Sequence, residues 1–186
     1  MQQILVRKLR KVTLKTLPLY ILGLLALLTA QPRLDFLGAG LLFVMLGEGV
    51  RIWAAGHLQK NEELTTTGPY AYVKNPLYLG TFLLIVGFSL MMNHLLILAL
   101  GVGVFLFYYV PYKRRRESER LAQRFGQRWQ AYEALVPDYW PRLSPYEHRG
   151  DDRWSIHRMI NNSEHETLLT VLLGIVVIIL KAFVEN

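Results

Sequence analysis

Long blocks of apolar residues, set apart by polar stretches, constrain the fold of this 186-residue chain more than any other feature. A helix needs about 20 predominantly apolar residues to cross the hydrocarbon core of a bilayer. Blocks long enough to suggest such helices lie near Leu17–Ala30, Leu34–Ala55, Leu77–Met92, Leu95–Tyr112 and Thr167–Val184. The sequence therefore predicts an all-α, polytopic membrane helix bundle with about five transmembrane helices, forming one membrane domain over residues 1–186.

The polar stretch from Lys113 to His165 is too long to be a simple connector between the last two blocks. Within it, Leu121, Phe125 and Trp129 recur at every fourth residue, which predicts an amphipathic helix. Taken alone, this pattern is typical of a helix that lies on the bilayer surface. We expect the stretch to pack on the cytoplasmic face of the bundle.

The basic residues predict the orientation of the bundle. They gather before the first block, in the loop Gly56–Asn75, and between Lys113 and Arg158. Lysine and arginine are enriched on the cytoplasmic side of membrane proteins, so the N-terminus and these two segments are expected in the cytoplasm and the C-terminus outside. The net charge of +7 then reflects topology and attraction to the lipid surface, and no nucleic-acid partner is expected.

The first and last blocks carry signals of their own. A basic start followed by an apolar run also resembles a signal peptide, but Leu28 occupies a position where cleavage after Ala30 needs a small residue. We therefore expect an uncleaved first helix. Ser163 and Glu166 have the spacing of a capping box, which predicts an additional C-terminal transmembrane helix within residues 163–186.

The motifs of many soluble enzymes are missing from the sequence. It contains no G-x-G-x-x-G and no Walker loop, its five histidines are scattered, and it has no cysteine, so no metal site is expected. Two ionisable residues, Glu48 and Arg51, lie one helical turn apart inside an apolar block. Charged residues at membrane depth are candidates for a functional site. The simpler interpretation is that these two pair with each other near the cytoplasmic end.

The most informative stretch runs from Leu64 to Gly80, where a loop with a Gly-Pro turn leads into a helix with proline in its first turn. Free backbone N–H groups at such a helix start can hold an anionic group. Tyr70, Tyr72 and Tyr78 would flank it with flat apolar surface and hydroxyl donors. An interfacial belt of aromatic residues explains the tyrosines equally well.

Taken in order, the pieces resemble the isoprenylcysteine carboxyl methyltransferase family and the related integral-membrane phospholipid methyltransferases. The resemblance covers a core of about residues 41–143, with a cofactor loop at 56–80 and a lid at 113–143. It is carried by the following residues: Arg51, Gly68-Pro69-Tyr70, Lys74-Asn75-Pro76-Leu77-Tyr78-Leu79-Gly80, Glu117, Phe125-Gly126 with Trp129 and Tyr132, and Pro137 and Pro141. The chain departs from the family pattern at Lys74, Asn75 and Ser118, where the family has arginine, histidine and a second glutamate.

This resemblance implies S-adenosylmethionine as the methyl donor, bound at the cytoplasmic mouth, with a lipophilic small molecule or a lipid as acceptor. The positions that would hold the cofactor are Gln59, Leu64, Thr65, Tyr70, Asn75, Pro76, Leu77, Tyr78 and Glu117. Lys113 occupies the position that contacts the acceptor in the family. Asn75 still offers a hydrogen-bond donor and an acceptor in place of the family histidine.

Methyl transfer from a sulfonium needs no metal, and an ionised acceptor needs no general base, so catalysis would come mainly from alignment and exclusion of water. An amine acceptor would have to lose a proton, and Glu117 is the candidate for that catalytic role. Two alternatives stay open: a nicotinamide-dependent membrane reductase, and a non-catalytic lipid-binding or assembly subunit of the same fold. The last helix would close the bundle or join two copies in a homo-oligomer.

Overall fold

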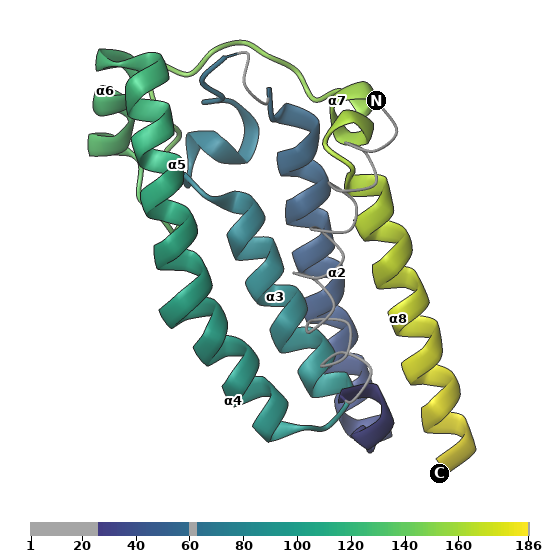
Figure 1. Cartoon of the computed structure of the whole chain (residues 1–186). Helices are drawn as coiled ribbons and strands as arrows, with labels where there is room; N and C mark the ends of the chain where they lie inside the picture. Colours follow the sequence, from purple (N-terminus) through teal and green to yellow (C-terminus); the bar gives the residue numbers. More distant parts are fainter. Residues whose placement is uncertain (1–25, 60–62, 186) are drawn as a thin grey trace, which may run out of the picture.

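The computed structural model of the chain describes residues 26–59 and 63–185, and within these ranges every regular element is helical (Figure 1). A short helical piece at residues 26–29 comes first. The elements that follow are α2 (Leu34–His57), η1 (Gly68–Ala71), α3 (Pro76–Met91), α4 (Leu95–Val104), η2 (Phe105–Tyr109), α5 (Val110–Phe125), α6 (Gln127–Leu135), α7 (Ile156–Asn161) and α8 (Glu164–Glu185).

Three helices among the described residues are long and apolar enough to cross a membrane: α2, the continuous helix Leu95–Phe125 and α8. Helix α3 is equally apolar in character but has only 16 residues. Most of the first expected block, Leu17–Ala30, lies outside the described residues. The predicted all-helical membrane bundle is therefore confirmed, whereas the count of five spans is not.

Helices α2 and α3 form the closest helix pair of the bundle because glycines face each other along it. A Cβ atom on Gly47 would lie 2.8 Å from the carbonyl oxygen of Gly80, and one on Gly87 would lie 2.7 Å from that of Gly40. No side chain fits between backbones that approach so closely. Small residues serve this purpose in membrane helix packing generally.

The helix Leu95–Phe125 combines α4, η2 and α5 in one rod of 31 residues, or about 46 Å at 1.5 Å per residue. This is longer than the hydrocarbon core of about 30 Å, so its charged second half extends beyond the apolar region. The π-helical turn η2 ends just before Pro111, which has no backbone N–H, and Val110 donates to the carbonyl of Phe105.

The lid turns back on itself at Gly126, whose φ of +51° suits glycine. Helix α6 then places Trp129 and Tyr132, with Val136 and Tyr146, in a small core against Ala71 of η1. The aromatic face that would lie on the bilayer according to its spacing therefore packs against the cofactor loop instead. A buried partner surface within the protein displaces the bilayer as the neighbour of these rings.

Helix α8 lies beside α2 and closes the bundle on the side away from α4 (Figure 1). Val171 and Ile178 are buried with Val44 of α2, and Gly174 faces the ring of Phe88 on α3. The start of α8 falls within the predicted capping box, although Ser163 has a φ of +60°. The helix thus supplies one wall of the bundle, while its outer face keeps large exposed apolar side chains.

Candidate functional site

One cavity of about 370 Å³ opens between the end of α2 with the loop that follows it, the first turns of α3, and helices α5 and α6 of the lid. Eight of the nine predicted cofactor positions line it: Gln59, Leu64, Thr65, Tyr70, Asn75, Leu77, Tyr78 and Glu117. The ninth, Pro76, is fully buried at the first turn of α3. Lys113 lies on α5, and its side chain is outside the part of the chain that the structure describes. The fold thus brings together residues that are up to 58 positions apart, from Gln59 to Glu117.

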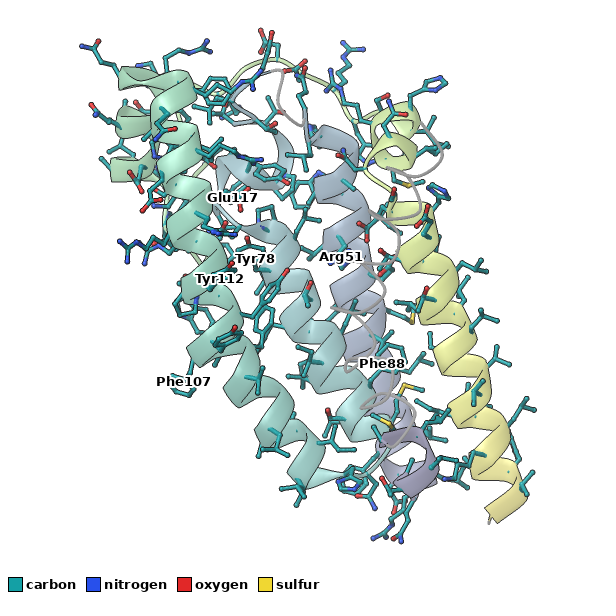
Figure 2. All side chains as sticks on the ribbon, in the orientation of Figure 1. Arg51, Tyr78, Phe88, Phe107, Tyr112 and Glu117 are labelled. Carbon is teal, nitrogen blue, oxygen red and sulfur yellow. The ribbon has the colours of Figure 1, made fainter. Side chains whose placement is uncertain are left out.

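Tyr78 and Glu117 join the two helices at the centre of the cavity. The Tyr78 hydroxyl donates to Oε2 of Glu117 at 2.9 Å, from α3 to α5 (Figure 2). The ring of Tyr109 packs edge-on against Tyr78, with 6.0 Å between centroids. Arg120 lies 3.8 Å from the other carboxylate oxygen, and the Glu117 side chain is 41% exposed. The carboxylate is therefore oriented by the protein and still accessible from the cavity.

The cofactor loop is held by hydrogen bonds on both of its sides. The backbone N–H of Gln59 donates to Oγ1 of Thr65 at 3.0 Å, and the Gln59 side chain donates to Asp152 at 2.7 Å. The Tyr132 hydroxyl donates to the carbonyl of Tyr70 at 2.7 Å. Burial raises the pKa of both tyrosines above the ordinary value, so their hydroxyls stay protonated at neutral pH.

Asp138 fastens the lid over the cavity, a role that was not anticipated from the sequence. Its carboxylate pairs with Lys74 at 3.1 Å and with Arg114 at 2.6 Å. The side-chain amide of Asn75 donates to the Asp138 carbonyl at 3.2 Å. Asn75 thus connects the loop to the lid. The sequence signal that could have pointed to Asp138 is an acidic residue between Pro137 and Pro141, and in the structure this residue lines the cavity.

A carboxylate also faces Ser118, the position where the resemblance places a second glutamate. The Ser118 hydroxyl donates to Oε1 of Glu133 at 2.8 Å, and both residues line the cavity. Glu133 belongs to α6, which follows α5 after the turn at Gly126. The negative charge missing from position 118 is therefore supplied from the neighbouring helix of the lid.

Arg51 forms part of the inner wall of the cavity, and its main partner is not the one expected. Its guanidinium makes two hydrogen bonds to Glu164 of α8, at 2.7 and 3.0 Å, and a third to Thr81 at 2.7 Å. Glu48, the expected partner, is 4.0 Å away. The carboxylate oxygens of Glu48 are buried without a hydrogen-bond partner among the described residues. The C-terminal helix therefore holds in place one residue of the cavity wall, Arg51, without lining the cavity itself.

No group of three or more His, Cys, Asp or Glu side chains that could hold a metal ion occurs among the described residues. Glu117, Glu133 and Asp138 of the cavity are instead engaged with basic residues, a tyrosine or a serine, as described above. The cavity thus presents oriented carboxylates, tyrosine hydroxyls and apolar side chains such as Leu64, Leu77 and Phe125.

Comparison with known proteins gives a family and two relatives. Residues 37–128 match the phospholipid methyltransferase family. The cobalt-zinc-cadmium resistance protein CzcN of Cupriavidus metallidurans is 35% identical over 120 residues, 63% of this chain and 54% of the relative. The nickel-cobalt-cadmium resistance protein NccN of Alcaligenes xylosoxydans xylosoxydans is 31% identical over 143 residues, 72% of this chain and 65% of the relative. The chain thus spans less than two thirds of the length of these curated relatives. No solved structure matches the chain.

Proposed function

We propose that this chain, which belongs through residues 37–128 to the phospholipid methyltransferase family of integral membrane methyltransferases, transfers a methyl group from S-adenosylmethionine to a lipophilic or lipid-like acceptor. The observation that carries the proposal is that eight of the nine predicted cofactor positions line the same cavity. The family match and the cavity agree, because all eight positions lie within residues 37–128, and α6, which follows Gly126, completes the lining with Trp129, Tyr132 and Glu133.

The donor set of the cavity suits the proposed cofactor. Its volume of about 370 Å³ falls in the range of roughly 300–1,000 Å³ that is common for small-molecule sites. Glu117 offers negative charge to a sulfonium or ammonium group, and Arg120 and Arg114 offer positive charge to a carboxylate. Leu64, Phe125 and other apolar side chains offer flat surface to an adenine ring.

In the proposed reaction, S-adenosylmethionine would supply an electrophilic methyl group, which the acceptor attacks in line so that S-adenosylhomocysteine leaves. The protein contributes alignment and exclusion of water. Tyr78 holds Glu117 in one orientation by donating a hydrogen bond from its hydroxyl to the carboxylate. The lid is fastened to the loop by the Asp138–Lys74 pair and tied within itself by the Asp138–Arg114 pair, and it closes one side of the cavity against solvent. For an amine acceptor, Glu117 would take the proton that the nitrogen loses, and Lys113 remains our candidate for contact with the acceptor.

We further propose that the cavity faces the cytoplasm. The arginine-rich part of α5 and the loops around the cavity lie at the same end of the bundle (Figure 1). Helix α8 begins at that end and runs to the opposite end of the bundle. The excess of basic residues at the cavity end supports this orientation.

The names of the two relatives support a physiological extension of the proposal. Both are named as proteins of resistance to cobalt, cadmium and other metal ions. We propose that the methylated product of this chain contributes to tolerance of such ions. Deletion of the gene should then sensitise cells to cadmium or cobalt, and Glu117→Gln should fail to restore growth where the wild-type chain succeeds. Full rescue by Glu117→Gln would separate tolerance from the proposed methyl transfer.

Binding of S-adenosylhomocysteine to the detergent-purified protein, measured by calorimetry, tests the central proposal. We expect saturable binding that Tyr78→Ala and Glu117→Gln weaken. Tyr72→Phe serves as a matched control, because Tyr72 lies in the same loop but does not line the cavity. Binding of NADPH alone would favour a nicotinamide-dependent reductase. Binding of neither ligand by folded protein would favour a non-catalytic lipid-binding or assembly subunit.

A further inference from the structure

We propose that the lid carries a membrane anchor at residues 140–143, which inserts Trp140 and Leu143 into the interface of a leaflet with anionic headgroups. The anchor is distinct from the spanning helices and from the aromatic face of α6, which is buried. This inference does not depend on the chemistry proposed for the cavity, because it concerns only where the lid meets the bilayer.

Backbone contacts set the height of the anchor along the bundle. The N–H of Lys74 donates to the Pro137 carbonyl at 2.8 Å, and the N–H of Arg142 donates to the Tyr72 carbonyl at 3.0 Å. The lid segment between Pro137 and Arg142 therefore lies against residues 72–75. The apolar helix α3 begins at the next residue, Pro76. The anchor thus lies at the level of the N-terminal end of α3, where the apolar part of the bundle begins.

The long helix gives the same height independently. Asp138 pairs with Arg114 at 2.6 Å, and Arg114 comes two residues after Tyr112, the last residue of the apolar block. Both helices next to the anchor therefore change from apolar to polar surroundings at its level. That change marks the boundary between hydrocarbon and headgroups, where tryptophan is enriched in membrane proteins.

The side chains of the anchor are turned outward. Trp140 is 83% exposed and Leu143 is fully exposed, although the flanking residues Val136 and Tyr146 are buried in the core beneath α6. The segment is thus pinned at both ends while it presents its two largest apolar groups to the surroundings. Outside the spanning helices, these two are the most exposed large apolar side chains of the described residues. Exposed apolar groups on a pinned segment usually mark a contact surface.

The charges beside the anchor define the chemistry of its partner. Arg114, Arg115 and Arg116 follow one another where the long helix leaves its apolar part. Arg114 pairs with Asp138 and Arg115 with Glu119, whereas Arg142 lies inside the anchor itself. Arg116 stacks over the ring of Tyr112 at 4.9 Å from its centroid, an arrangement that keeps its charge at this level. Basic residues beside a membrane helix attract anionic lipids. The partner is therefore a lipid surface with negative headgroups.

The absence of cysteine from the chain allows a direct test by single-site spin labelling. We would introduce Trp140→Cys or Leu143→Cys, attach a nitroxide, and reconstitute the full chain in nanodiscs. Phe107→Cys, at a residue that points away from the bundle on the long helix and is 85% exposed, marks the lipid-facing limit (Figure 2). Gln127→Cys, at the exposed start of α6, marks the aqueous limit.

In nanodiscs with phosphatidylglycerol, we expect the labels at 140 and 143 to collide more with oxygen than with a water-soluble nickel chelate, as the label at 107 does. In pure phosphatidylcholine we expect both labels to lie closer to the water. Accessibility equal to that of the label at 127 in both lipids would overturn the proposal. Equal depth of the labels in the two lipids would overturn the role of the arginines. Spin–spin broadening that disappears on dilution with unlabelled protein would show that Trp140 and Leu143 contact a second copy of the chain, which would overturn the membrane anchor.

Discussion

The contact between Arg51 and Glu164 allows a quantitative prediction, because it joins the cavity wall to a helix that begins 113 residues later. Glu164 is only 3% exposed, and its carboxylate receives two hydrogen bonds from the guanidinium. The change Glu164→Gln keeps the size of the side chain but removes its charge. Arg51 then remains in a nearly closed environment, with hydrogen bonds to Thr81 and Thr167 and with the Glu48 carboxylate 4.0 Å away.

Removal of one partner from a buried ion pair typically costs about 3–5 kcal/mol. Thr81 and Glu48 remain near the guanidinium, and the glutamine amide oxygen can still accept one hydrogen bond. We therefore expect the unfolding free energy to fall by about 2–3 kcal/mol, at or slightly below the lower limit of that range. The loss of charge near the cavity should also weaken S-adenosylhomocysteine binding, since Arg51 lines the cavity.

The measurement is reversible unfolding in mixed micelles, followed by circular dichroism. Glu166→Gln is the matched control, because it removes the same charge from the same helix turn at an exposed position. The interaction with the helix dipole is therefore similar in both variants. A Glu164→Gln protein as stable as Glu166→Gln would refute the argument. In the double variant with Arg51→Gln, the second change should cost much less than it does in the wild-type background.

Three further outcomes are expected. Gly47→Ala should destabilise the bundle by roughly 1–3 kcal/mol, the usual cost of overpacking. Gly49→Ala should be neutral, because a Cβ atom there meets open space. Equal unfolding curves of the two variants would contradict the packing described. Asp138→Asn should loosen the lid and speed limited proteolysis near residue 138, while the exposed Asp151→Asn should not; unchanged cleavage would show that its ion pairs do not hold the lid. Because burial raises the pKa of Tyr132, the folded state keeps the hydroxyl proton above pH 10 while the unfolded state loses it. The free energy of unfolding should therefore fall as the pH rises above 10. Tyr132→Phe should make this fall less steep when unfolding is measured as a function of pH.

The apolar blocks alone were sufficient to predict a helical membrane bundle, because a run of about 20 apolar residues has few other environments available to it. The cofactor loop was also accessible from local signals. Gly68, with a φ of +57°, makes the turn, and Pro76 begins α3, so the tyrosines on either side fall near the same helix end. The family resemblance then implied nine cofactor positions, eight of which line one cavity.

Contacts between distant segments needed the tertiary structure. Periodicity showed that Leu121, Phe125 and Trp129 share one face of the lid, but it could not distinguish a bilayer from a protein surface as the neighbour of that face. In the structure, Trp129 is buried with Ala71, while Leu121 and Phe125 pack beside them. Both surroundings are apolar, so the same pattern satisfies either one.

The choice of partner among the charged residues was equally open. Arg51 has Glu48 one turn away on its own helix, yet it binds Glu164 across the bundle, and Asp138 joins Lys74 to Arg114 across the lid. The sequence by itself determined which segments are helical and apolar and which short motifs lie at their ends, since those properties depend on neighbouring residues. Only the packing of the helices decided which charges meet, because an ion pair depends on distances in space that the separation along the chain does not set.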